Sequence, residues 1–108
     1  MKEVNVDWVR VASVDDLHEE RGLRVSVDGE EVALFKRQGI IYALHNVCAH
    51  QHFSLLHEGE TEGLFVSCPM HGWKYDIATG EAIRGSGKLR VYEVKIQGDE
   101  VLLKVPTI

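Results

Sequence analysis

The sequence predicts a single domain of the all-β class, built as an antiparallel β-barrel or sandwich. Two patterns support this prediction. Apolar runs of four to eight residues recur at short spacing, and a turn signal such as Asp28-Gly29 separates each run from the next. The chain has 108 residues, which is enough for one core that buries roughly 65% of the surface of the unfolded chain. We therefore expect one domain with few helices.

Four strands are expected in the first half of the chain, over residues 4–12, 23–27, 32–36 and 40–44. Ser13 follows the first of them and can cap a single helical turn that runs through Asp16. In the second strand apolar and polar residues alternate, so Leu23, Val25 and Val27 should face the core. The last strand is continuously apolar, which predicts little exposure.

Three short strands are expected next, over residues 64–67, 73–76 and 81–83, with Thr79-Gly80 as the turn before the last of them. A hairpin closes the chain: Tyr92, Val94 and Ile96 face one way, Gly98-Asp99 forms the turn, and residues 101–105 return. The strands at 40–44 and 64–67 each lead directly into a segment with a cysteine. Two strand ends should therefore present two loops that carry chemistry.

The charge of the chain argues against a nucleic-acid partner, because the formal net charge is -5 and no basic run is longer than Lys36-Arg37. An acidic surface suits docking to a basic patch on another protein, although a solvated acidic face without a specific partner remains the plain alternative. No apolar run approaches the ~18 residues of a membrane span, and the first four residues lack the apolar run of a secretory signal. We expect a cytoplasmic protein without membrane contact.

The two cysteines carry the strongest chemical signal. They are too few for the disulfide framework of a small secreted domain. Each is followed closely by a histidine, in Cys48-Ala49-His50 and, after seventeen intervening residues, in Cys68-Pro69-Met70-His71. The chain has only six histidines, so coincidence explains this spacing poorly. The pattern predicts a metal or redox site that contains Cys48, His50, Cys68 and His71.

Two kinds of metal centre can use such a donor set. One tetrahedral Zn²⁺ can be held by two cysteines and two histidines, but zinc sites usually group ligands of one type in pairs at short intervals. Here each loop supplies one thiolate and one imidazole. A two-iron centre with the thiolates on one iron and the imidazoles on the other suits this pattern better. A zinc-stabilised binding module stays as the alternative of another class.

The two segments, Cys48-Ala49-His50 and residues 68–76 followed by Thr79-Gly80, resemble the cluster-binding loops of the Rieske family. The resemblance extends over nearly the whole chain. Trp8-Val9-Arg10-Val11, Val27-Asp28-Gly29 and the Gly98-Asp99 hairpin are similar to the free-standing Rieske ferredoxins of bacterial ring-hydroxylating oxygenases. The resemblance implies a Rieske-type fold in one domain, 1–108, with a small cluster-binding subdomain at about residues 45–76.

The resemblance also implies one [2Fe–2S] cluster per chain, with Cys48 and Cys68 on the inner iron and His50 and His71 on the outer iron. Such a chain is an electron carrier and not an enzyme. The family implies that a flavin-dependent NAD(P)H reductase delivers the electron and that a terminal oxygenase receives it, both in transient complexes with a monomer. The small Rieske-type subunit of an NAD(P)H nitrite reductase is similar in fold and length, and Trp73 gives this alternative some weight. A cluster motif does not encode the partners, the pathway or the final substrate.

Some positions differ from the high-potential members of the family. Phe53 and Met70 stand where those proteins have two further cysteines, so no disulfide can join the loops. Trp73 stands where they have a serine that donates to a cluster sulfide, and the loss of that donor implies a lower reduction potential. Tyr75 has two interpretations: the family implies a hydroxyl that donates to a cysteine sulfur, and otherwise it is a partly buried strand residue with its hydroxyl in water.

The histidines outside the motif are expected to have ordinary roles. His18, His45 and His57 are interpreted as surface or packing residues.

Overall fold

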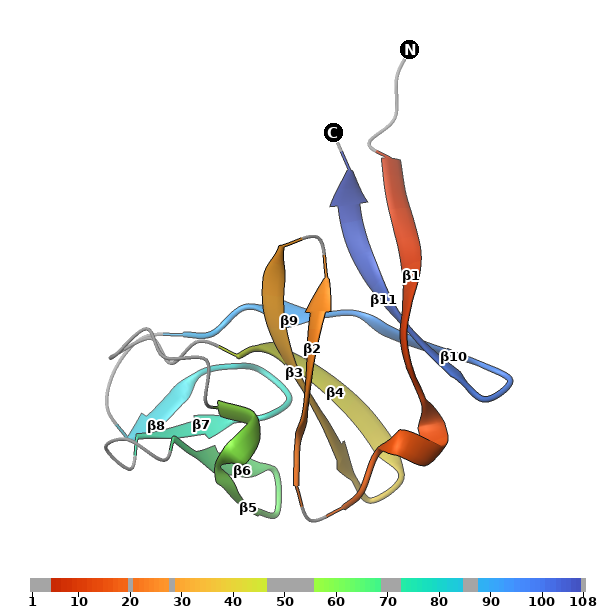
Figure 1. Cartoon of the computed structure of the whole chain (residues 1–108). Helices are drawn as coiled ribbons and strands as arrows, with labels where there is room; N and C mark the ends of the chain where they lie inside the picture. Colours follow the sequence, from red (N-terminus) through yellow and green to blue (C-terminus); the bar gives the residue numbers. More distant parts are fainter. Residues whose placement is uncertain are drawn as a thin grey trace.

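The computed structural model describes residues 5–19, 21–27, 29–46, 56–68, 73–84 and 88–107. Almost all regular structure in these ranges is β-strand (Figure 1). The elements are β1 (Asn5–Ser13), η1 (Val14–Asp16), β2 (Leu23–Val27), β3 (Glu30–Arg37), β4 (Ile40–His45), η2 (Leu56–Glu58), β5 (Glu60–Glu62), β6 (Phe65–Ser67), β7 (Lys74–Asp76), β8 (Ala82–Arg84), β9 (Val91–Tyr92), β10 (Val94–Gln97) and β11 (Glu100–Thr107). The η elements are single 3₁₀ turns, and the predicted all-β class is confirmed.

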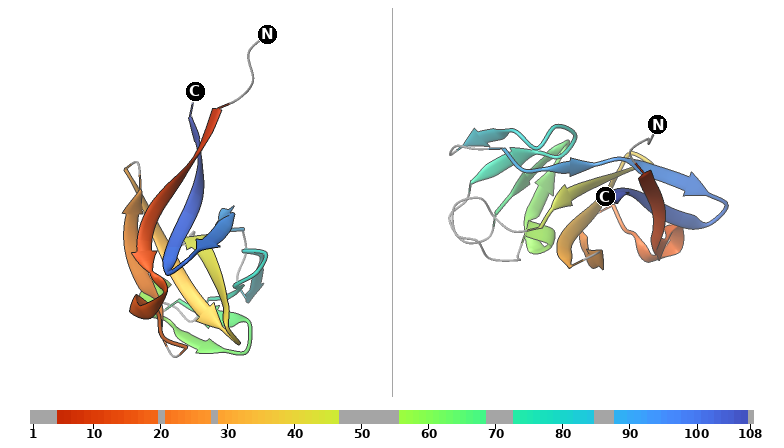
Figure 2. Two further views of the ribbon diagram at one scale, coloured as in Figure 1. Left: turned by 90° about the vertical axis from the view of Figure 1, so that its right-hand side faces the viewer. Right: turned by 90° about the horizontal axis from the view of Figure 1, so that it is seen from above.

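The strands of the described residues form three antiparallel sheets. Their orders are β1-β11-β10, β2-β3-β4-β9 and β5-β6-β7-β8. The second sheet lies between the other two in Figure 1 and in the view from above on the right of Figure 2. The long β1–β11 ribbon extends away from the body at one end, and the sheet with the second cysteine segment lies at the other end.

The β3–β4 hairpin separates two hydrophobic cores. Val32 and Leu34 point into a core shared with the first sheet, whereas Ala33 and Phe35 point into a core shared with the third sheet. All four side chains are at most 1% exposed. Both faces of the strand are therefore covered, which is the condition under which a strand is continuously apolar instead of alternating. The core on the side of the third sheet also contains Cys68.

A two-residue turn closes this hairpin at Gln38-Gly39. Both residues have positive φ, 54° and 81°, as a type I′ turn requires. Gln38 tolerates this conformation because the Glu19 carboxylate accepts the N–H of Gln38 at 2.8 Å and that of Gly39 at 3.0 Å. These two hydrogen bonds, with that from Gly39 the larger cause, lower the pKa of Glu19 below 4.5. A segment remote in sequence thus stabilises the hairpin tip.

Several predicted elements are confirmed. The helical turn after Ser13 is η1, in which the Ser13 N–H donates to the Asp16 carboxylate at 3.0 Å. In β2 the apolar residues are buried or half-buried, whereas Arg24 and Ser26 are exposed. The turn at Gly98 joins β10 to β11, with Gln97 opposite Glu100. These elements depend on neighbouring residues, which a sequence pattern captures well.

The predicted continuous strand over residues 92–96 is wrong. The chain leaves the second sheet after Tyr92, which pairs with Ala43, and joins the first sheet at Val94, which pairs with Leu103. Glu93 lies between β9 and β10, and its carbonyl oxygen accepts the Lys104 N–H at 3.1 Å. The strand is broken because its two halves serve different sheets.

Two further details differ from the prediction. Ile40 is 55% exposed because it follows the hairpin tip, so the run 40–44 is buried only toward its end. The strand β5 was not predicted, since Glu60-Thr61-Glu62 has neither the apolar content nor the propensity of a typical strand. It forms because β6 offers a free edge across the turn at Gly63.

Candidate metal centre

Cys68 lies directly after β6, and its side chain is buried, with 1% exposed. Residues two apart on a strand point to the same face, so the core-facing Val66 sets the direction of the thiol. Both side chains belong to one core cluster with Leu56 and Tyr75. A thiolate in such apolar surroundings is protected from water, which suits a ligand of iron or zinc.

The base of the second predicted ligand loop is closed by backbone atoms. The Cys68 N–H donates to the Trp73 carbonyl oxygen at 2.6 Å, and the adjacent residues Ser67, before Cys68, and Lys74, after Trp73, are paired across β6 and β7. The loop between them, residues 69–72, lies outside the described residues. The strand pair therefore extends up to the point where the loop leaves the sheet.

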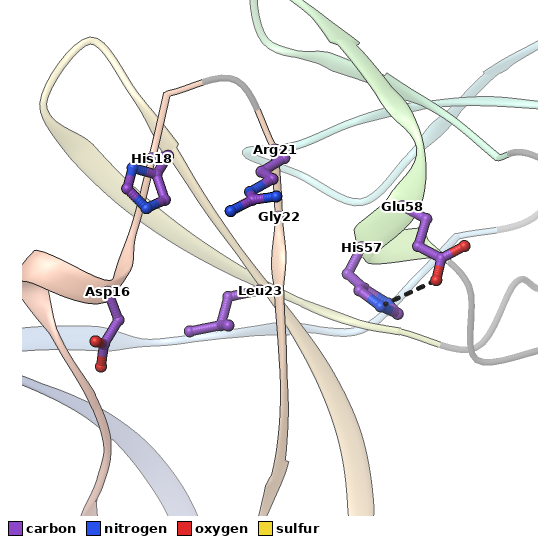
Figure 3. Close-up of a pocket in the computed structure, with 7 residues that line it drawn as sticks. All are labelled: Asp16, His18, Arg21, Gly22, Leu23, His57 and Glu58. Atoms are coloured by element: carbon purple, nitrogen blue, oxygen red, sulfur yellow. Dashed lines mark ion pairs between the residues drawn. The ribbon is translucent and has the colours of Figure 1, made fainter.

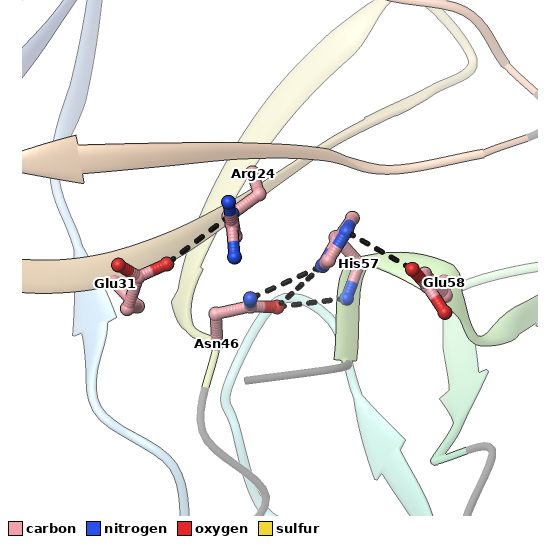
Figure 4. A network of polar contacts seen from close by, with 5 residues as sticks. All are labelled: Arg24, Glu31, Asn46, His57 and Glu58. Atoms are coloured by element: carbon pink, nitrogen blue, oxygen red, sulfur yellow. Dashed lines mark hydrogen bonds and ion pairs between the residues drawn. The ribbon is translucent and has the colours of Figure 1, made fainter. Parts of the chain in front are cut away.

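The base of the first predicted ligand loop is closed by Asn46, which is fully buried after β4 (Figure 4). Its carbonyl oxygen accepts the Leu56 N–H at 3.2 Å, and its side-chain Oδ1 accepts the His57 N–H at 2.7 Å. The Nδ2 of Asn46 lies 3.1 Å from Nδ1 of the His57 ring. One residue thus holds the chain on both sides of residues 47–55.

The two loop bases share a single core. Leu56 is fully buried in the same cluster as Cys68, and its N–H is bonded to Asn46. The structure therefore brings the ends of both predicted ligand loops together. The other predicted ligands, Cys48, His50 and His71, lie outside the described residues, as do Phe53 and Met70.

Tyr75 lies in β7, two residues after Trp73, and is fully buried. The interpretation of Tyr75 as a strand residue with its hydroxyl in water is therefore wrong. The reason is that β7 turns this side chain toward the core shared with the β3–β4 hairpin, where Phe35 and Ile77 cover it. Trp73 is partly buried and packs against the same cluster.

A cluster of three polar side chains, Glu30, Arg90 and Tyr92, lies on the second sheet near the end of β4. Glu30 Oε1 accepts the Tyr92 hydroxyl at 2.5 Å and pairs with the Arg90 guanidinium at 2.7 Å. The hydrogen bond from Tyr92, followed by that from Arg90, lowers the pKa of Glu30 below 4.5. Burial, followed by the hydrogen bond to Glu30, raises the pKa of Tyr92 to about 12. The Arg90 carbonyl oxygen accepts the His45 N–H at 2.9 Å, which joins this group to the residue before Asn46.

His57 also lines a shallow open pocket of about 280 Å³. Figure 3 shows His18 and Arg21 on one side of this pocket and Glu58 beside His57. Glu58 Oε2 is 3.7 Å from His57 Nε2. Within the described ranges, no group of three or more histidine, cysteine or acidic side chains could hold a metal ion. The pocket is therefore lined by side chains of both charges, and none of its lining residues belongs to the predicted ligand set.

Sequence reasoning missed the role of Asn46 and treated His57 as a surface or packing residue. His57 is half-buried, with 18% of its side chain exposed, and it bonds to a fully buried amide. The available signal was that Asn46 stands at the end of an apolar strand, two residues before Cys48. A polar residue in that position requires a partner when the strand end is buried.

A family model described as the Rieske [2Fe–2S] domain matches residues 7–96 of the chain. The chain belongs to the Rieske [2Fe–2S] domain family. Its cofactor is a Rieske-type [2Fe–2S] cluster, and the protein is an electron carrier and not itself an enzyme. The predicted cofactor is confirmed, and the buried thiol of Cys68 fits it. The alternative of a zinc-stabilised module finds no support.

Two similar proteins are ferredoxins. The ferredoxin component of the naphthalene 1,2-dioxygenase/salicylate 5-hydroxylase systems of Ralstonia sp is 35% identical over 101 residues, which cover 92% of this chain and 96% of the relative. The ferredoxin of Sphingomonas yanoikuyae B1 has a solved structure that matches with a TM-score of 0.86 and 25% identity, over 93% of this chain and 100% of that chain.

A second similar solved structure is that of the putative NADH-dependent nitrite reductase small subunit from Mycobacterium tuberculosis. It matches with a TM-score of 0.87 over 96% of this chain and 99% of that chain, at 20% identity. At this level of identity the likeness concerns the fold alone. In the described part of the chain, no helix has the length and apolar character needed to cross a membrane.

Proposed function

We propose that Cys48, His50, Cys68 and His71 bind the cluster, and that the chain carries single electrons from a flavin-dependent NAD(P)H reductase to a terminal oxygenase. The position of Cys68 is the observation that carries the ligand assignment. Its thiol is buried at the closed base of one loop, on the same core as the base of the other loop. The spacing of one cysteine and one histidine in each loop supports the other three ligands.

In this proposal the two thiolates bind the inner iron and the two neutral imidazoles bind the outer iron. When bound, such a cluster takes up and releases one electron at a higher potential than an all-cysteine plant-type cluster. The protein contributes the dry surroundings of the inner side, where Leu56, Val66 and Tyr75 are fully buried around Cys68. These side chains keep water from the sulfur and hold its loop in place.

The proposed partners rest on the relatives and on charge. The relative from Ralstonia sp is named as a component of dioxygenase and hydroxylase systems. The net charge of -5 suits brief docking to basic patches, which accelerates encounter more than it strengthens a complex. We propose a monomer that acts in the cytoplasm, where NAD(P)H supplies the electrons. We also propose that residues 1–108 form one domain with a cluster-binding subdomain at about 45–76.

The ligand assignment is tested by visible absorption and low-temperature EPR spectroscopy of the purified protein, oxidised and then reduced with dithionite. The wild type should give a Rieske signal that disappears in His71→Ala. His18→Ala is the matched control, because His18 is an exposed histidine outside the motif and should leave the signal unchanged. A His71→Ala protein with the wild-type signal would remove His71 from the ligand set.

The partner assignment is tested by adding the protein to an oxygenase–reductase pair that lacks its own ferredoxin. Restored turnover that depends on the reduced protein supports the proposal. Failure with several such pairs, together with copurification of a sirohaem protein, would instead favour the nitrite reductase subunit.

A further inference from the structure

The first ligand loop has a long span and a base that is closed by one side chain. Nine residues, 47–55, separate Asn46 from Leu56. Backbone bonds hold Asn46 on both sides, because its N–H donates to the Glu31 carbonyl oxygen at 2.9 Å and its carbonyl oxygen accepts the Leu56 N–H at 3.2 Å. The Asn46 side chain also contacts two groups of His57, its backbone N–H and the ring nitrogen Nδ1.

These contacts determine how both side chains are oriented. Oδ1 of Asn46 accepts the His57 N–H at 2.7 Å, so the amide NH₂ faces the ring nitrogen Nδ1 at 3.1 Å. The ring nitrogen Nδ1 also lies 3.3 Å from Oδ1, so it accepts from the amide NH₂ in one tautomer and donates to Oδ1 in the other, while Nε2 lies on the side of Glu58 (Figure 4). Asparagine is the residue of this length that presents both an acceptor and a donor, so alanine or leucine at position 46 would lose both bonds.

Burial makes these contacts compulsory. Asn46 is 0% exposed, so water cannot replace a lost partner of its amide. The His57 N–H at the start of the following segment would also lose its acceptor if the amide were removed. To give these buried groups new hydrogen-bond partners, the chain would have to move at residues 46, 56 and 57, which are the ends of the loop.

We propose that Asn46 and His57 are positioning residues for the cluster, which they serve by locking the base of the loop that carries Cys48 and His50. This inference rests on the ligand set proposed above. The clasp, defined as the contacts of the Asn46 side chain with the backbone N–H and the ring Nδ1 of His57, sets where the loop leaves and rejoins the core. It thereby determines how firmly one thiolate and one imidazole are presented to the irons.

The test compares Asn46→Ala, His57→Ala and His57→Asn in the intact protein loaded with its cluster. The side chain of asparagine can place an amide oxygen or nitrogen near the position of Nδ1, so His57→Asn keeps a hydrogen-bonding partner for the Asn46 amide. His18→Ala and Glu58→Gln are the controls, because they change the same pocket and leave the clasp intact. The readouts are the rate of cluster loss to an iron chelator and the EPR g-values of the reduced protein, with circular dichroism to check the fold.

Loss of the clasp should accelerate cluster release. We expect about a tenfold increase in Asn46→Ala, which removes about two hydrogen bonds, and a somewhat smaller increase in His57→Ala, which removes about one. The g-values should shift in both variants and return toward those of the wild type in His57→Asn. Both controls should match the wild type.

Three results would overturn the proposal. They are an unchanged release rate in a folded Asn46→Ala, wild-type g-values in both alanine variants despite lower stability, and equal effects of His18→Ala and His57→Ala. A wild-type protein without any Rieske signal would instead contradict the proposed ligand set. The failures of the two proposals are therefore distinguishable.

Discussion

The bases of the two ligand loops are closed by different means. The base of the second loop is a backbone hydrogen bond between Cys68 and Trp73 at the end of a strand pair, across four intervening residues. The base of the first loop spans nine residues and adds the side chain of Asn46 to its backbone bonds. Closing nine residues instead of four costs about 0.7 kcal/mol more in chain entropy. A side-chain hydrogen bond of about 1 kcal/mol offsets that difference.

This comparison teaches where each loop is vulnerable to substitution. A backbone bond survives most changes of side chain, so the second base should be robust as long as β6 and β7 remain paired. The first base depends on the chemical identity of two side chains. The substitutions below act first on Leu56, which both bases share. They then act on two glycines between the loops, and finally on more distant polar side chains.

The largest effect is expected from Leu56→Ala, because Leu56 links the two bases. It is fully buried against Cys68, and its N–H is bonded to Asn46. Removing its side chain leaves a cavity in the core that the two loop bases share and should lower the free energy of unfolding by about 3 kcal/mol. Urea unfolding measures this effect. Leu64→Ala is the control, since Leu64 is 39% exposed and should cost well below half as much.

Gly59→Ala should have the next largest effect. A Cβ at Gly59 would overlap the Ser67 carbonyl oxygen, a backbone atom next to Cys68. The segment after the first loop and the strand before the second would have to separate, at a cost of about 2 kcal/mol in the free energy of unfolding.

Gly63→Ala distinguishes this overlap from the cost of the backbone conformation. Gly63 has a φ of 59° and open space where a Cβ would lie, so alanine should cost only about 1 kcal/mol. Thermal unfolding of both variants with the cluster bound gives the comparison. Equal destabilisation would show that the close approach of Gly59 to β6 is unimportant.

Arg37→Ala should have a moderate effect on the sheet that carries the second base. The guanidinium of Arg37 donates to the Gly63 carbonyl oxygen at 2.7 Å, to Thr61 Oγ1 at 3.2 Å and to the Glu19 carbonyl oxygen. It thus anchors the β5–β6 turn to the tip of the β3–β4 hairpin. Its loss should lower the free energy of unfolding by about 1–2 kcal/mol, measured in urea, because charged hydrogen bonds are stronger than neutral ones. The neighbouring Lys36→Ala should change it by less than about 0.5 kcal/mol.

The smallest effect concerns pH and the polar group near the first base. The pKa of Tyr92 is raised from 10.0 to about 12, so the folded state favours the neutral phenol. This contribution to stability is complete below pH 10 and is lost as the pH rises toward about 12. Because Tyr92 is only partly buried, solvent screening should keep the loss well below the full linkage value.

Tyr92→Phe should remove this alkaline loss, which urea unfolding at a series of pH values would measure. Tyr42→Phe is the control and should keep it. The absorbance of tyrosinate during an alkaline titration is a second check. The assignment of the alkaline loss to Tyr92 would be contradicted if Tyr92→Phe and Tyr42→Phe lost the same titration step.

Local patterns predicted much of the fold. The alternation in β2, the turn at Gly98 and the helical turn at Ser13 follow from neighbouring residues, and each was located from them. The strand β5 and the break at Glu93 could not be predicted, because both depend on which strand lies alongside in the folded chain. For the site, the cysteine–histidine spacing predicted the cofactor and the family. It could not indicate the clasp, since Asn46 and His57 lie eleven residues apart and have no periodic relation.

By itself, the sequence determined which donors the chain offers and at what spacing, and hence that the protein belongs among the Rieske carriers. Ligand chemistry is a property of residue types and short intervals, which are written directly in the chain. The tertiary structure alone decided that Tyr75 is buried, that Leu56 joins the two loop bases and that Asn46 bonds to His57. These features depend on burial and on hydrogen-bond partners, which arise only when distant strands meet around a common core.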